Sequence, residues 1–124
     1  MRDQRLWTWH VLAGLVIFVL LGLHMAVMHL DTVLGWFNPE GLKPIAWESV
    51  LQRARMGFFT ISYIVLLGAA LFHGLYGLRN ILFELGLGRG AKGLVSVVLA
   101  LGGAGLFVYG AWAAWTAGAL ARSL

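Results

Sequence analysis

Apolar positions gather in long runs that polar stretches separate. The runs cover about residues 6–30, 57–83 and 93–118. Each run exceeds the roughly 20 residues that a helix needs to cross the hydrocarbon core of a bilayer. The pattern therefore predicts an all-α membrane protein, with three transmembrane helices that form a single domain.

A mixed segment lies between the first two runs. Pro44 begins a predicted helix that ends near Met56, and proline is tolerated in the first turn of a helix. We expect this helix to lie at the membrane interface or beneath a partner, because its apolar and charged positions are mixed. Its apolar positions are Ile45, Trp47, Val50, Leu51 and Ala54. Helix-breaking residues precede it, namely Asp31, Asn38, Pro39 and Gly41.

The third run carries no ionisable group in its core, and small residues recur along it about every four positions. A face of small residues allows another helix to approach closely. We expect a packing surface there rather than a chemical site. The small residues are Ser96, Ala100, Ala104, Gly110, Ala113, Ala114 and Ala117. A glycine-rich turn, residues 84–92, is predicted to join the second and third runs.

The composition agrees with a membrane protein. Of the 124 residues, 60% are hydrophobic and only 11% are charged, whereas soluble domains average roughly 25% charged residues. Cysteine is absent, which excludes disulfides and thiolate-bound clusters. The sequence shows no nucleophile–base pair, phosphate loop or zinc-ligand set, so we expect no catalysis by this chain alone. No cleavable signal peptide is expected, because the first run exceeds a typical signal-peptide core of about 7–15 residues.

Basic residues lie near the ends of the apolar runs, which indicates membrane flanks rather than a nucleic-acid surface. Basic flanks favour the cytoplasmic side. The slight bias therefore predicts that the N-terminus lies in the cytoplasm and the C-terminus outside, and we expect a multi-pass protein of the inner (cytoplasmic) membrane. The N-terminal flank and the second loop hold Arg2, Arg5, Arg89 and Lys92, with Arg79 near that end of the second run, and the opposite side holds Lys43, Arg53, Arg55 and Arg122.

His73 is the leading candidate for a functional residue. An ionisable side chain within an apolar span is costly without a partner. Ala69 and Gly77 lie four residues either side of it, and Ala70 and Gly74 lie on neighbouring rows of the helix. This small face leaves room for a close backbone or for a flat ring such as a porphyrin. Neutral imidazole is the commonest metal ligand among side chains.

His24 is the second candidate ligand. If the first run enters the membrane near Thr8, His24 lies roughly 24 Å from the inner edge. If the second run enters near Phe58, His73 lies roughly 22 Å from the outer edge and about 8 Å from the inner one. The two cannot readily ligate one iron. Each needs a partner histidine or serves a different haem, unless His24 is a packing or quinone-pocket residue.

The other polar side chains have simpler explanations. His10 and His29 lie near helix ends, where water and headgroups satisfy an imidazole. Tyr76 and Trp112 are interpreted as interface or packing aromatics. Arg79 and Glu84 lie near the inner interface, where they either serve a site or extend to the headgroups.

The run from His73 to Arg79, followed by Glu84, resembles the small three-span membrane anchors of succinate dehydrogenase and fumarate reductase. His24-Met25 near the end of the first run is similar to those anchors too. The resemblance covers all three runs, and its specific part is confined to residues 70–84. It implies that His73 is an axial ligand of haem b, while a second anchor subunit supplies the opposite ligand.

The same resemblance places Arg79 and Glu84 near the haem propionates or the quinone pocket, facing the iron–sulfur subunit. Leu85 follows Glu84 where some members of the family have a quinone-binding tyrosine, which leaves the quinone contacts open.

The implied function is a haem b-binding anchor of a succinate:quinone oxidoreductase. Its partners would be a flavoprotein subunit, an iron–sulfur subunit, a second anchor subunit, quinone and membrane lipids. One or two haems b would be shared with the partner subunit. Two alternatives stay open: a cytochrome b anchor of another respiratory dehydrogenase, such as a hydrogenase or formate dehydrogenase, and a small multispan transporter. The transporter is disfavoured because no carboxylate lies in mid-membrane.

Overall fold

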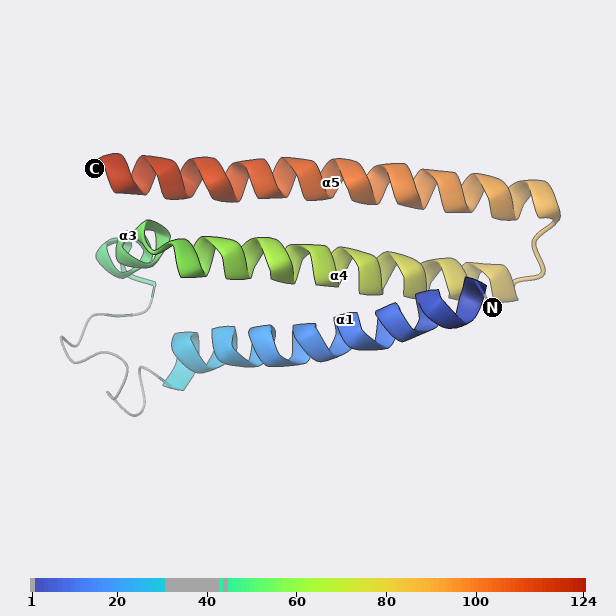
Figure 1. Ribbon diagram of the computed structural model, residues 1–124, viewed down its shortest axis with the longest axis horizontal. Helices are drawn as coiled ribbons and strands as arrows, with labels where there is room; N and C mark the ends of the chain where they lie inside the picture. Colours follow the sequence, from blue (N-terminus) through green and yellow to red (C-terminus); the bar gives the residue numbers. More distant parts are fainter. Residues whose placement is uncertain (1, 31–42, 44) are drawn as a thin grey trace.

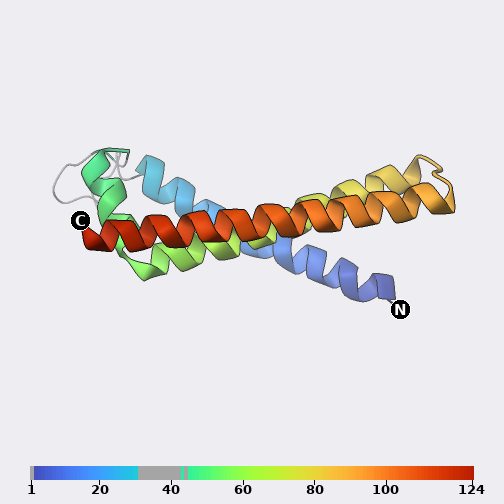
Figure 2. The same ribbon diagram turned by 90° about the horizontal axis from the view of Figure 1, so that it is seen from above.

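The computed structural model describes residues 2–30, 43 and 45–124, and over these residues the chain is helical apart from short connections. The elements are α1 (Arg2–Met25), the π-helical turn η1 (Ala26–Leu30), α3 (Trp47–Arg55), α4 (Gly57–Glu84) and α5 (Arg89–Ser123). The long helices lie in one layer with α4 in the middle (Figure 1). Helix α5 follows α4 closely, whereas α1 crosses α4 at an angle (Figure 2). The predicted all-helical fold, with a short helix between the first two long ones, is confirmed.

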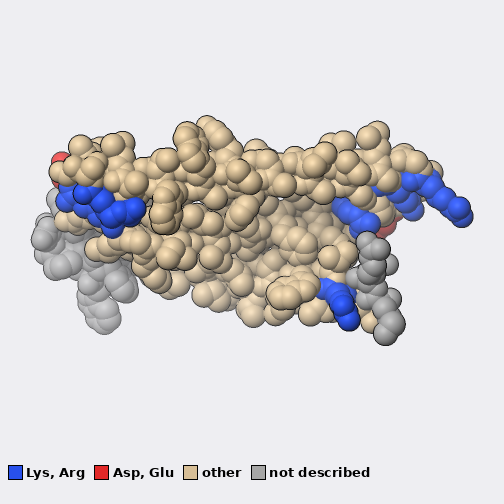
Figure 3. Space-filling view, turned by 45° about the horizontal axis from the view of Figure 1, so that its top comes forward, with Lys and Arg blue, Asp and Glu red and all other residues tan. Residues whose placement is uncertain are grey.

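Among the described residues, three helical stretches are long and apolar enough to cross a membrane. They are Gln4–His29, Gly57–Glu84 and Arg89–Ser123, within which 18-residue windows reach mean hydropathies of 2.6, 1.9 and 2.0. Lysine and arginine gather at the two ends of the molecule, and the surface between them is nearly free of charge (Figure 3). The 35 residues of α5 exceed the predicted run 93–118, so its ends extend beyond the hydrocarbon core.

The layer leaves most of its apolar surface open. Ala121 is the one buried hydrophobic residue in the described part of the chain, while Phe18 is 77% exposed and Leu101 is 70% exposed. Soluble monomers rarely expose contiguous apolar patches of such extent. These faces therefore suit lipid tails or other membrane helices.

Helices α4 and α5 meet through leucines that fit over glycines. A Cβ added at Gly103 would lie 2.5 Å from Leu75 Cδ1, and one added at Gly110 would lie 2.5 Å from Leu67 Cδ2. The small-residue face of α5 is thus a packing surface at Gly110, as expected. The close contact at Gly103 falls outside the predicted set.

The connection between α4 and α5 needs a glycine. Gly86 has φ +73°, in the left-handed region that favours glycine because a side chain there clashes with the backbone. Gly88 then caps the start of α5 with extended backbone. The predicted glycine-rich turn is therefore present, between Glu84 and Arg89.

Helix α3 packs against its own chain. Its Arg55 Nε donates a hydrogen bond of 2.9 Å to the carbonyl oxygen of Ala121 in α5, and Ser49 is buried. Ile45, ahead of α3, and Trp47 in its first turn are 74% and 67% exposed, so they are available to the interface or to a partner. The helix begins later than predicted, and Pro44 and residues 31–42 lie outside the described residues.

Candidate functional site

Two histidines from different helices lie face to face where α1 crosses α4. The rings of His10 and His73 are stacked, with centroids 4.0 Å apart and planes 4° from parallel. His73 Nδ1 lies 3.0 Å from the carbonyl oxygen of His10. Since a carbonyl oxygen can only accept, we assign the proton of neutral His73 to Nδ1. The lone pair of Nε2 is then the one that a metal can use.

Glycines make room for both rings. A Cβ at Gly14 would lie 3.1 Å from Cε1 of His73, and a Cβ at Gly77 would lie 3.5 Å from Cε1 of His10. Helices α1 and α4 run in opposite directions (Figure 1). In each helix a glycine follows the histidine by four residues, and this glycine lies against the histidine of the other helix. His10 is thus matched with Gly77 and His73 with Gly14, and we call this arrangement of four residues the histidine–glycine pair.

The histidine–glycine pair changes the interpretation of the small face around His73. On the Gly77 side, the space that we expected to be open to a flat ring holds the imidazole of His10. A Cβ at Gly74, the residue after His73, would meet nothing within 4 Å, and Gly74 is exposed. The surface of α4 at Gly74 is therefore uncovered by the described residues.

The sequence placed His10 near a helix end and did not predict its contact with His73. The structure places the Tyr76 ring 5.2 Å from that of His10, and Tyr76 in turn stacks on Phe72. His10 Nδ1 is buried and has no hydrogen-bond partner among the described residues. The signal that could have revealed this contact is the shared spacing, a histidine followed four residues later by a glycine in both runs.

Arg79 lies on the side of α4 that faces α5. Its Nε donates to Ser96 Oγ at 3.1 Å, and Ser96 Oγ donates to the carbonyl oxygen of Lys92 at 2.9 Å. The guanidinium carbon lies 4.2 Å from the centroid of the Phe83 ring. The structure therefore joins Arg79 to α5 and does not bring it to the histidine–glycine pair.

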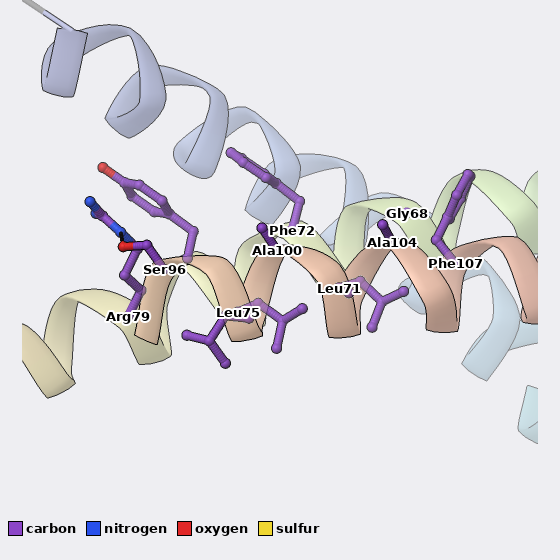
Figure 4. Close-up of a pocket in the computed structure, with 12 residues that line it drawn as sticks. Gly68, Leu71, Phe72, Leu75, Arg79, Ser96, Ala100, Ala104 and Phe107 are labelled. Atoms are coloured by element: carbon purple, nitrogen blue, oxygen red, sulfur yellow. Dashed lines mark hydrogen bonds between the residues drawn. The ribbon is translucent and has the colours of Figure 1, made fainter. Parts of the chain in front are cut away.

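A groove of about 450 Å³ runs between α4 and α5 from Arg79. Figure 4 shows Arg79 and Ser96 at one end of this groove and Phe107 at the other. An elongated apolar molecule with a polar head near Arg79 would fit it. Between those ends the lining is Gly68, Leu71, Phe72, Leu75, Tyr76, Leu99, Ala100, Gly103 and Ala104.

Glu84 ends α4 and is exposed at the same end of the molecule as the α4–α5 turn. The next residue, Leu85, is 70% exposed. The structure therefore leaves both side chains free to meet a partner at that end.

His24 lies in a separate place. Its ring meets Tyr63 edge to face, with centroids 6.1 Å apart, and Tyr63 precedes His73 by ten residues, roughly 15 Å along α4. His24 therefore cannot share one iron with His73. It lines a cavity of about 220 Å³ together with Leu20, Leu23, Val27, Met28, Arg53, Phe58, Phe59, Ser62, Tyr63 and Leu66.

Two local features distinguish the surroundings of His24. The π-helical turn η1 begins two residues after it, and such turns are frequent at functional sites. His29, in that turn, is exposed, as expected for a residue at a helix end.

Comparison with curated proteins finds a near full-length similarity. The succinate dehydrogenase hydrophobic membrane anchor subunit of Archaeoglobus fulgidus is 31% identical over 104 residues, which is 84% of this chain and 81% of that protein. No model of a protein family matches the chain, and no solved structure matches it.

Proposed function

The chain belongs to the family of succinate dehydrogenase hydrophobic membrane anchor subunits, and we propose that it holds haem b and supports electron transfer to quinone. In this proposal it is a non-catalytic subunit that anchors a flavoprotein and an iron–sulfur subunit, together with a second anchor subunit. Family membership argues against the transporter and against the anchor of a different dehydrogenase.

The hydrogen bond at His73 is the observation that carries the proposal. Histidines that bind metals almost always donate their other ring N–H to a carboxylate, a carbonyl or water, which fixes the tautomer. His73 Nδ1 donates in this way to the His10 carbonyl at 3.0 Å. Nε2 has no hydrogen-bond partner in the part of the chain that the structure describes. A bonded Nδ1 and an available Nε2 suit one axial ligand of a haem. A haem held there would supply a one-electron carrier.

His10 does not fit the opposite axial position. Axial imidazoles lie on opposite faces of a porphyrin, whereas the rings of His10 and His73 lie flat against each other at 4.0 Å. The opposite ligand would therefore come from a partner subunit. The exposed surface of α4 at Gly74, the residue after His73, is open to such a partner.

Arg79 and Glu84 have a proposed place at the end of the molecule that carries the α4–α5 turn, which we assign to the cytoplasmic side of the inner membrane. Guanidinium groups bind carboxylates and carbonyl oxygens through several N–H donors. The apolar groove that begins at Arg79 suits the tail of a quinone, with its head or a haem propionate near the guanidinium. Glu84 would face the iron–sulfur subunit from the same end.

His24 is proposed as a ligand of a second haem. Its own cavity of about 220 Å³ is smaller than the ~300–1,000 Å³ of typical ligand pockets, so most of such a site would lie at the partner interface. The other interpretation is a ring-sized quinone pocket formed with Tyr63. Haem content separates the two.

The primary experiment compares His73→Ala with His29→Ala in the assembled complex. His29 is an exposed histidine of the same chain and serves as the control. We expect His73→Ala to lose the reduced b-type absorption band of its haem completely, while His29→Ala keeps it. An unchanged spectrum in an assembled His73→Ala complex would reject the haem assignment.

A further inference from the structure

We propose that His10 is a positioning residue, which fixes the orientation and raises the basicity of the His73 imidazole. The inference rests on the proposed function, in which His73 Nε2 binds haem iron. It adds a role for α1, the helix that sequence reasoning connected only with His24. His10 would act through His73 and would not touch the iron.

The first support is that α1 contacts the His73 ring on one face and along one edge. One ring face lies against the His10 ring at 4.0 Å, and Nδ1 is 3.0 Å from the His10 carbonyl. The ring edge at Cε1 is 3.1 Å from the place that a Cβ at Gly14 would take. A stacked face and a bonded edge together restrict rotation of the imidazole. Nε2 is the ring nitrogen that these contacts leave available.

The second support is that packing alone does not explain a histidine at position 10. Its buried Nδ1 has no partner among the described residues, and an unsatisfied buried polar atom costs free energy that an apolar side chain would avoid. The ring is nevertheless held from two sides, by Tyr76 at 5.2 Å between centroids and by Gly77. This arrangement keeps the His10 ring parallel to that of His73.

The physical effect acts through the iron ligand. Donating Nδ1–H to a carbonyl raises the basicity of the ligating nitrogen. A more basic ligand stabilises ferric over ferrous iron, so weakening this contact should raise the midpoint potential of the haem. A looser ring should also change the ferric electron paramagnetic resonance signals, which depend on ligand orientation.

The test uses the assembled complex with Gly14→Ala, His10→Leu and His10→Phe. The methyl group of Gly14→Ala presses on the His73 ring, whereas a Cβ at Gly22 in the same helix meets nothing within 4 Å, so Gly22→Ala is the matched control. His10→Leu removes the stacked ring and so loosens the contact of His73 Nδ1 with the backbone carbonyl, which both His10 variants keep, and His10→Phe keeps a ring at this position. The readouts are haem content, midpoint potential and the ferric resonance signals.

We expect Gly14→Ala and His10→Leu to raise the midpoint potential and shift the ferric signals, with a smaller shift in His10→Phe and none in Gly22→Ala. Wild-type signals and potential in both Gly14→Ala and His10→Leu would overturn the proposal. Complete loss of haem from an assembled His10→Phe complex would also overturn it, because His10 would then be a ligand. If His10→Leu does not assemble, Gly14→Ala and His10→Phe decide the question.

His73→Ala, measured alongside, distinguishes a failure of the positioning role from a failure of the proposed function. If it loses the haem while the Gly14 and His10 variants behave as wild type, only the positioning role fails. If it keeps the haem, the proposed function fails and the positioning role fails with it.

Discussion

The two faces of α4 are built differently. Toward α5, Leu67 and Leu75 fit over glycines, in contacts that involve only apolar groups. Toward α1, His73 meets a backbone carbonyl and a second imidazole, and its ring occupies the space beside Gly14 that a Cβ would need. Both faces use glycine to bring helices close, but only one of them fixes the orientation of a ring nitrogen.

This difference shows how small residues serve two purposes in one layer of helices. Without a hydrophobic drive between helices in lipid, close van der Waals packing holds α4 to α5. On the other face, the closeness that Gly14 and Gly77 permit brings Nδ1 of His73 within hydrogen-bonding distance of the His10 carbonyl oxygen. We therefore expect mutations at the glycines of the α5 face to change stability and mutations at the glycine and histidine of the α1 face to change the haem.

The largest effect should come from filling a glycine on the α5 face. In Gly103→Ile the new side chain collides with Leu75, and overpacking of this kind costs about 1–3 kcal/mol. We expect lower thermal stability and less assembled complex, with a normal b-type spectrum in what does assemble. Gly102→Ile is the matched control, because a Cβ there meets nothing within 4 Å. Equal stability of the two variants would contradict the packing role.

The next effect concerns His24, which lies between α1 and α4 but lacks the carbonyl contact of His73. If His24 ligates a second haem through a partner interface, His24→Ala should halve the haem content per complex. The band lost in His73→Ala should remain. Pyridine haemochrome measurement against the protein content of the complex provides the count. A full haem content in His24→Ala would make His24 a pocket residue beside Tyr63.

The smallest effect is expected at Arg79, where the α5 face carries its polar contact. Arg79→Lys keeps the charge but loses the planar set of N–H donors. Losing about 1 kcal/mol of hydrogen bonding should lower quinone reduction roughly fivefold while the complex still assembles. Arg89→Lys, at the exposed start of α5, is the control. Wild-type quinone reduction and haem midpoint in Arg79→Lys would reduce Arg79 to an interface anchor.

Much of the fold followed from the sequence alone. Three apolar runs were long enough to span a bilayer, and the glycine-rich stretch between the last two became the turn at Gly86. These features are local, since helix length and turn chemistry depend on neighbouring residues. The candidacy of His73 was local too, because the cost of an imidazole in an apolar run can be judged without knowing its neighbours.

Only the tertiary structure decided which side chains meet. A helix turns by about 100° per residue, so the contact between His10 and His73 depends on how α1 is rotated and shifted against α4. In the same way, Arg79 meets Ser96 only because leucines fitting over glycines set the register of α4 and α5. No single run contains that information, because register and crossing angle are properties of two helices together.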